Sequence, residues 1–122
     1  MKVLIVDDDT SIRKRYRKLL SENNIKTLVA PEALKVGEIL MRDKSELALI
    51  LLDLQIKEVD GRGIWEIVQE YCPSIPIIVS SVLPIKEQKL RIPRARGYFN
   101  KADGDEKLLE QVKKVLGTSS IN

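Results

Sequence analysis

Short apolar runs alternate with longer amphipathic stretches along the whole chain of 122 residues. The runs have the length of strands, and in the stretches between them apolar positions recur at helical spacing. The predicted strands are 3–6, 27–30, 47–52, 75–80 and 97–100. The predicted helices are 11–22, 32–42, 62–71, 85–91 and 106–116. Five strand–helix units in this order are typical of an α/β fold, in which helices cover both faces of a parallel sheet.

Two details of the pattern refine this prediction. Segment 47–52 is apolar at every position, as expected for a central strand that is covered on both faces. Helix 85–91 is bracketed by Pro84 and Pro93, which predicts that it is short. The last helix should stop at Gly117, so we expect one domain over 1–117 and a frayed tail over 118–122.

Composition narrows the possible functions. Hydrophobic residues make up 43% of the chain, enough for one core, and the net charge of +3 does not by itself indicate nucleic-acid binding. The chain contains no His, which excludes His-dependent catalysis, His metal ligands and an internal phosphohistidine. Its N-terminal apolar run is too short for a signal peptide, and no stretch is long enough to span a membrane, so we expect a cytoplasmic location.

Polar residues gather where the predicted strands end, the edge at which open parallel sheets bind ligands. Asp7, Asp8 and Asp9 follow the first strand, and Asp53 follows the third. These carboxylates would repel one another unless a cation neutralised them, and ligands that are all oxygen suit Mg²⁺. Ser80 and Lys101 at the same edge would complete a site for phosphoryl transfer.

Simpler interpretations exist for each residue taken alone. One of the aspartates at 7 to 9 could cap the following helix, and Asp53 could be a loop residue. Asp60 and Gly61 could form only a turn. The joint placement of these groups at strand ends is what favours a chemical site.

These residues resemble the receiver domain of bacterial response regulators, the CheY-like family, over practically the entire chain. The resemblance rests on four segments in order: Val-Asp-Asp-Asp at 6–9, Leu-Leu-Asp-Leu-Gln-Ile-Lys-Glu-Val-Asp-Gly at 51–61, Val-Ser-Ser at 79–81 and Tyr-Phe-Asn-Lys at 98–101. It implies a flavodoxin-like (βα)5 fold, a doubly wound five-stranded parallel sheet with strand order 2-1-3-4-5. It also implies a signalling domain, not a conventional enzyme.

For the acidic cluster, the resemblance implies that Asp53 accepts the phosphoryl group. Asp8 and Asp53 would bind Mg²⁺ together with the main-chain carbonyl of Gln55. Asp7 would assist through water.

For the remaining site residues, the resemblance implies a separate role for each. Lys101 would pair with the phosphoryl oxygens, and Ser80 would donate a hydrogen bond to them. The movement of Ser80 would free space for Tyr98 to change rotamer, which couples the site to the surface. Gln55 and Val82 occupy positions that tune the lifetime of the phosphoaspartate.

The sequence departs from the family pattern at three places. Lys57 stands where proline is usual, and Ala102 replaces the proline of a cis Lys-Pro bond. Because a cis bond before a residue other than proline costs about 2.5–4 kcal/mol, we expect the Lys101–Ala102 bond to be trans. The fourth helix is short and lies beside a cluster of arginines, Arg91, Arg94 and Arg96.

The resemblance also implies partners: a sensor histidine kinase or phosphotransfer protein, an unknown downstream target or output domain, and a homodimer that could form on phosphorylation. No membrane or direct nucleic-acid contact is expected. Two alternatives remain. One is a pseudo-receiver, an interaction module that phosphate does not control. The other is a haloacid-dehalogenase-type phosphatase, with Asp7 as nucleophile and Asp9 as acid/base.

Overall fold

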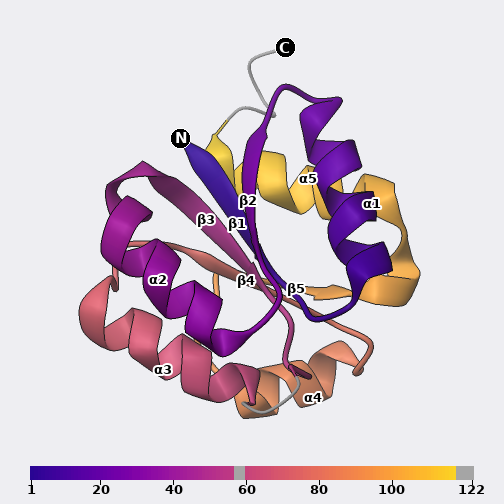
Figure 1. The fold of residues 1–122 in the computed structure, drawn as a ribbon. Helices are drawn as coiled ribbons and strands as arrows, with labels where there is room; N and C mark the ends of the chain where they lie inside the picture. Colours follow the sequence, from indigo (N-terminus) through magenta and orange to yellow (C-terminus); the bar gives the residue numbers. More distant parts are fainter. Residues whose placement is uncertain (57–59, 118–122) are drawn as a thin grey trace.

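A parallel sheet forms the centre of the molecule in the computed structural model, which describes residues 1–56 and 60–117. Its strands are β1 (Lys2–Val6), β2 (Lys26–Ala30), β3 (Leu47–Leu52), β4 (Ile77–Ser81) and β5 (Gly97–Asn100). The α-helices are α1 (Thr10–Ser21), α2 (Ala33–Asp43), α3 (Gly61–Tyr71), α4 (Ile85–Arg91) and α5 (Asp105–Leu116). Short 3₁₀ turns, Lys44–Glu46 and Lys101–Asp103, follow α2 and β5. Strands and helices alternate around the sheet (Figure 1).

The strand order is β2-β1-β3-β4-β5, and every pairing between neighbours is parallel. This confirms the predicted fold and strand order. The predicted boundaries agree with the structure to within one residue, except that β4 begins at Ile77 instead of Ile75. Pro76 lies between them and has no N–H to donate to a neighbouring strand. Lys57 and the predicted tail at 118–122 lie outside the described residues.

Alternate residues of the inner strands feed two separate hydrophobic clusters, one on each face of the sheet. On one face Leu4 and Ile50 pack with residues of α2 and α3, such as Val36 and Ile64. On the other face Ile5 and Leu51 pack with residues of α1 and α5, among them Tyr16, Leu20, Leu108 and Val112. The run that is apolar at every position is therefore the central strand β3, with both of its faces covered.

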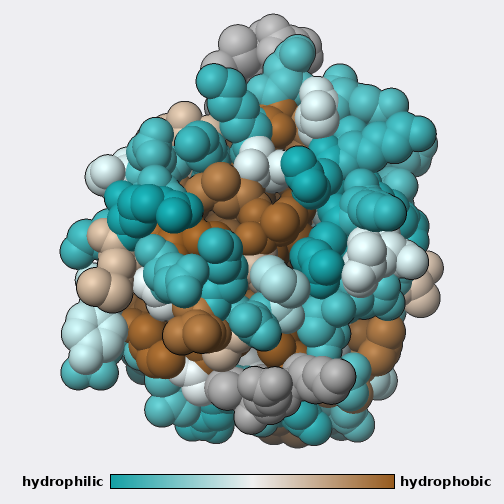
Figure 2. All heavy atoms as spheres, in the orientation of Figure 1, coloured by the Kyte–Doolittle hydropathy of each residue, from teal (hydrophilic) through white to brown (hydrophobic). Residues whose placement is uncertain are grey.

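The edge of the sheet at β2 is less well covered than its centre. Leu28 and Val29 of this strand are only partly buried. Figure 2 shows hydrophobic residues in the middle of this face, with hydrophilic residues around them. Across residues 1–56 and 60–117, the helices are all too short or too polar to cross a bilayer.

Side chains and backbone geometry set the ends of the helices that border the site. Asp9 caps α1, its Oδ1 accepting hydrogen bonds from the N–H groups of Ser11 (2.8 Å) and Ile12 (3.3 Å). Asp60 caps α3 in the same way, accepting from the N–H of Arg62 at 3.0 Å. The predicted short helix, α4, ends before Ile92, and α5 ends at Gly117 in the left-handed conformation, with φ of 75°.

Candidate functional site

The polar residues singled out in the sequence meet at the carboxyl ends of the strands. Asp7 follows β1, Asp53 follows β3, and Lys101 follows β5. The backbone holds the two aspartates in place, because the N–H of Asp53 donates to the carbonyl of Val6 at 3.0 Å and the N–H of Asp7 donates to that of Ala30 at 3.2 Å. Each aspartate therefore extends the hydrogen-bond ladder of the sheet by one residue.

A largely buried lysine lies between these two carboxylates. Nζ of Lys101 lies 2.6 Å from Oδ2 of Asp7 and 3.3 Å from Oδ2 of Asp53. The side chain of Lys101 is 11% exposed, and the side chains of Asp7 and Asp53 are 3% and 5% exposed. The bond between Lys101 and Ala102 is trans, as predicted. The trans bond does not prevent the ammonium group from reaching the acidic cluster.

The third member of the acidic cluster is Asp8, which is exposed. One carboxylate oxygen from each of Asp7, Asp8 and Asp53 lies within 4.8 Å of the others. Three carboxylates with no nitrogen or sulfur ligand form a donor set that suits a hard divalent cation such as Mg²⁺. The N–H of Gln55 donates to Oδ1 of Asp53 at 3.1 Å, which orients the carboxylate, while metal binding by the Gln55 carbonyl stays a prediction.

Burial and neighbouring charges together raise the pKa values of both Asp53 and Lys101. The pKa of Asp53 is raised from 3.8 to about 6, because burial and the charge of Asp7 together outweigh the lowering effect of the Gln55 N–H and Lys101. Burial lowers the pKa of Lys101, but the hydrogen bond to Asp7 and the charges of both carboxylates outweigh it, so its pKa is raised. The lysine is therefore a permanent cation beside an acidic group that is costly to ionise.

The hydroxyl of Ser80, on β4, is buried and already has a partner. It lies 3.0 Å from the hydroxyl oxygen of Tyr16 on α1, and either group can be the donor. Burial raises the pKa of Tyr16, although the hydrogen bond to Ser80 and the charge of Lys101 oppose the rise. The neighbouring Ser81 is fully buried, and its Oγ accepts a hydrogen bond from the N–H of Leu83 at 3.2 Å.

The predicted switch residue, Tyr98, lies on β5 and is half-buried. Its hydroxyl donates to the carbonyl of Ile92 and accepts from the N–H of Ala95 at 3.1 Å. The Nζ of Lys89 lies 5.7 Å from the centre of its ring. In this conformation the ring is tied to the loop between α4 and β5. Val82, the predicted lifetime residue after β4, is 62% exposed.

Three residues near the site have roles that the sequence pattern did not reveal. Tyr16 forms part of the apolar stripe of α1, where nothing indicates that its hydroxyl meets Ser80. Arg13 donates from Nη1 to the carbonyl of Asp7 at 2.9 Å. Gly61 was considered only as part of a turn, but a Cβ there would lie 2.4 Å from the carbonyl oxygen of Asp53. Only glycine allows the start of α3 to approach Asp53 so closely.

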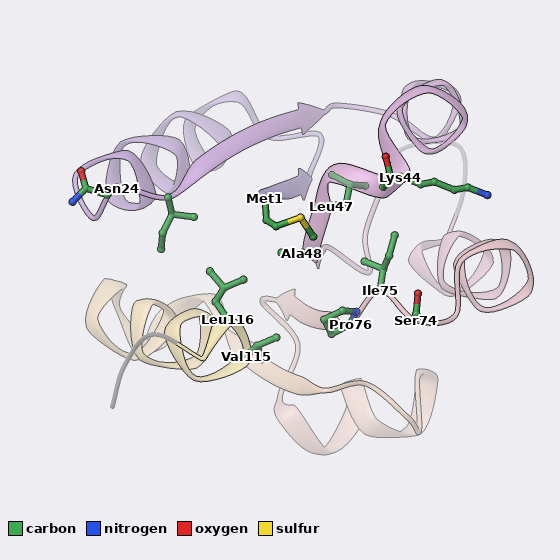
Figure 3. Close-up of a pocket in the computed structure, with 12 residues that line it drawn as sticks. Met1, Asn24, Lys44, Leu47, Ala48, Ser74, Ile75, Pro76, Val115 and Leu116 are labelled. Carbon is green, nitrogen blue, oxygen red and sulfur yellow. The ribbon is translucent and has the colours of Figure 1, made fainter. Parts of the chain in front are cut away.

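A cavity of about 630 Å³ lies at the opposite end of the sheet, where the strands begin (Figure 3). Met1, Leu47 and Pro76, which lie at or just before the first residues of β1, β3 and β4, line it together with Val115 and Leu116 of α5. In the part of the chain that the structure describes, no acidic side chain lines this cavity. The reactive groups and this cavity therefore belong to opposite ends of the molecule.

Solved structures share this arrangement of strands and helices. A CheY-like receiver domain from Methanospirillum hungatei JF-1 is 22% identical, with a TM-score of 0.85 over 99% of this chain and 98% of the other. The BeF3-activated receiver domain of DrrB, a protein of Thermotoga maritima, is 25% identical, with a TM-score of 0.79 over 95% of this chain and 97% of the other.

Sequence comparison leads to the same family. An NtrX-like response regulator of Rickettsia felis is 29% identical over 121 residues, which is 98% of this chain. The chain spans 26%, about a quarter, of the length of that relative. The family model described as the response regulator receiver domain matches residues 3–113. Receiver domains are signalling modules and not conventional enzymes. With five strands in the order 2-1-3-4-5 and this match over most of its length, the chain belongs to the response regulator receiver domain family.

Proposed function

We propose that this domain is a phosphorylation-controlled signalling switch in which Asp53 accepts a phosphoryl group from a partner histidine kinase or phosphotransfer protein. One observation carries the proposal. The Asp53 carboxylate lies at the end of the central strand, 3.3 Å from the Lys101 ammonium and beside the oxygens of Asp7 and Asp8. This places a nucleophilic oxygen, a fixed cation and two further carboxylates around one point, as phosphoryl transfer requires.

Asp7, Asp8 and Asp53, with the main-chain carbonyl of Gln55, are the groups that would hold Mg²⁺. The bound ion would neutralise the charge of the cluster and of the incoming phosphoryl oxygens. The raised pKa of Asp53 supports this assignment, because an acidic group that is costly to ionise in the protein alone gains most from a nearby cation.

Lys101 and Ser80 would stabilise the phosphorylated state. Lys101 keeps its charge at neutral pH because the two carboxylates outweigh the effect of burial on its pKa, so it can neutralise a phosphoryl oxygen when Asp53 no longer carries a negative charge. Ser80 would turn its hydroxyl from Tyr16 towards the phosphoryl group. Tyr98 would then leave its contacts with the loop between α4 and β5 and alter the surface that a downstream target recognises.

The contacts of Asp7 and Asp9 argue against the phosphatase alternative. Asp7 accepts hydrogen bonds from Lys101 at 2.6 Å and from the N–H of Asp9 at 2.9 Å, so both of its carboxylate oxygens are engaged. Oδ1 of Asp9 caps α1. Both oxygens of Asp53 also have partners, the Gln55 N–H and Lys101, but its contact with Lys101 is longer, at 3.3 Å against 2.6 Å for Asp7. We therefore favour Asp53 over Asp7 as the nucleophile.

Labelling with a small phosphodonor tests the proposal. Wild-type protein is incubated with Mg²⁺ and acetyl phosphate, and the modified residue is mapped by mass spectrometry after reductive trapping. We expect label at Asp53, none in Asp53→Ala, and slower labelling in Lys101→Ala. Label at Asp7 would support the phosphatase. No label, together with no response to beryllofluoride, would support a pseudo-receiver.

The setting of the switch follows from the same proposal. The histidine kinase, the output target and the cytoplasmic location are inferred from the family, since response regulators relay signals from such kinases. Formation of a homodimer on phosphorylation belongs to the same inference. Sedimentation of the protein with and without beryllofluoride tests it directly.

A further inference from the structure

The short helix α4 carries a fully buried glutamine on its inner side. Gln88 is 0% exposed, and it is the buried residue of that helix. An amide in such a place has to satisfy its polar atoms within the protein, because water cannot reach them. The partners of Gln88 therefore indicate what the residue does.

The amide nitrogen of Gln88 is surrounded by three main-chain carbonyl oxygens. Nε2 lies 2.8 Å from the carbonyl oxygen of Leu83, 3.0 Å from that of Phe99 and 3.4 Å from that of Ser81. Two hydrogens are thus shared among three acceptors. Rotating the amide by 180° would point its oxygen at the same three carbonyls, so the contacts also define its orientation.

These three carbonyls belong to different parts of the molecule. Ser81 ends β4, Leu83 lies in the loop between β4 and α4, and Phe99 lies on β5. Asn100 donates to the same Leu83 carbonyl at 3.4 Å, but from β5. Gln88 is therefore the point at which α4, the loop and two strands of the site are joined.

The amide oxygen of Gln88, unlike the amide nitrogen, has no acceptor role among the residues that the structure describes. Within the described part of the chain, Oε1 is buried and has no hydrogen-bond partner. An apolar side chain of similar size would avoid this penalty but would leave the carbonyls without their donor. The donor contacts of Nε2 are thus what the glutamine contributes at this position.

We propose that Gln88 is a positioning residue for the phosphorylation site, clamping the loop that joins β4 to α4. The loop begins after Ser81, one residue beyond Ser80, and carries Val82, whose side chain is exposed. With the clamp closed, the loop and α4 keep one position relative to β4 and β5. Release of the clamp loosens the loop and lets water reach the acyl phosphate on Asp53. This inference rests on the proposed function of Asp53, but the clamp itself does not.

Hydrogen exchange of the unphosphorylated protein tests the clamp alone. Gln88→Met keeps the length and bulk of the side chain and removes its donors. Exchange in the segment 81–92 should rise about tenfold, the effect of losing about one net hydrogen bond. The matched control is Gln111→Met on α5, whose Nε2 donates to the carbonyl of Tyr98 at 3.0 Å. Gln111 contacts β5, as Gln88 does, but not the loop. Its substitution should therefore leave hydrogen exchange in segment 81–92 unchanged.

The second readout is the lifetime of the phosphoaspartate. In Gln88→Met the loss of label from Asp53 should be roughly fivefold faster than in the wild type, and in Gln111→Met it should be unchanged. Both variants lose one amide that donates to the main chain, and their free energies of unfolding show whether a general loss of stability accounts for the difference. If Gln88→Met does not fold, Gln88→Leu replaces it, with circular dichroism as the check.

The outcomes separate the clamp from the proposed function. Unchanged exchange at 81–92 in the Gln88 variants would overturn the clamp. Faster exchange with an unchanged lifetime, or the same lifetime change in the Gln111 variant, would overturn its role at the site. A wild type that takes no label at Asp53 would refute the proposed function, and the exchange data would still decide whether the clamp exists.

Discussion

The hydroxyl oxygen of Tyr16 lies 3.0 Å from that of Ser80, and both side chains are buried. Ser80 is the residue expected to donate to the phosphoryl group on Asp53. A serine hydroxyl has one hydrogen to donate, so when Ser80 donates it to Tyr16 it has to break that bond before it can donate to a phosphoryl oxygen. In that arrangement Tyr16 competes with the phosphoryl group for the Ser80 hydrogen.

Replacing Tyr16 with Phe should shift the domain towards its activated form. The change removes the competing hydroxyl and keeps the ring in the core, so beryllofluoride should bind roughly threefold to tenfold more tightly, corresponding to one hydrogen bond. The fluorescence of Trp65, the one tryptophan of the chain, can follow the titration. Tyr71→Phe is the matched control, since Tyr71 is 67% exposed. Equal affinities in both variants would show that Tyr16 does not restrain Ser80.

Adjacent aspartates allow the metal site to be tested. Mg²⁺ at about ten times its dissociation constant should raise the melting temperature of the wild type by roughly 3–6 °C. Asp8→Asn should reduce this response, because Asp8 contributes to the cluster of carboxylates. Asp9→Asn should retain it, because Asp9 is the cap of α1 and asparagine caps a helix equally well. A Mg²⁺ response that depended on Asp9 and not on Asp8 would contradict the assignment.

The raised pKa of Asp53 predicts how stability depends on pH without metal. A carboxyl group with a pKa of about 6 in the folded state and 3.8 when unfolded binds its proton more tightly in the folded protein. Its contribution is favourable below pH 3.8 and is lost as pH rises through 6. Asp53→Asn should therefore be more stable than the wild type at pH 7, by about 3 kcal/mol, and about equally stable near pH 3.5.

Urea unfolding at several pH values measures this difference. Asp103→Asn, a change at an exposed position, serves as the control and should follow the wild-type curve. Should the curves of the Asp53→Asn variant and the wild type stay parallel between about pH 3.5 and 7, burial of Asp53 has no energetic consequence.

Gly61 offers a test of the close approach between α3 and the acceptor. Gly61→Ala puts a Cβ 2.4 Å from the carbonyl oxygen of Asp53 and 2.7 Å from Cα of Leu54, so the backbone has to move. We expect a loss of about 1–3 kcal/mol in the free energy of unfolding, with slower labelling of Asp53. Gly37→Ala, on α2 where nothing lies within 4 Å, should instead stabilise the protein by about 0.5–1 kcal/mol. Similar effects at both glycines would rule out a special role for Gly61.

The sequence predicted the fold and the meeting of the acidic residues because both depend on local patterns. Apolar runs define the strands, and in a parallel sheet their carboxyl ends lie at one edge, so Asp7 and Asp53 had to come close. The position of Lys101 was harder to predict, since no proline follows it. The structure brings its ammonium group to both carboxylates with a trans bond.

Contacts made by single side chains between distant elements could not be predicted in the same way. Tyr16 and Ser80 are 64 positions apart, and neither residue type indicates which side chain it contacts. Gln88 looks like one of the polar residues of an exposed helix, yet it is buried, whereas the apolar Leu90 of the same helix is 72% exposed. Such pairings depend on how the helices pack on the sheet, which periodicity alone does not specify.

The division of the core by the sheet has a consequence for how this domain can change. Leu4 and Ile5 are neighbours in the chain but pack against different helices. Substitutions on opposite faces share few neighbours, so their effects on stability should add, whereas substitutions within one cluster should couple. Substitutions can therefore accumulate in the layer of α2 and α3 during evolution without disturbing how α1 and α5 pack on the other face of the sheet.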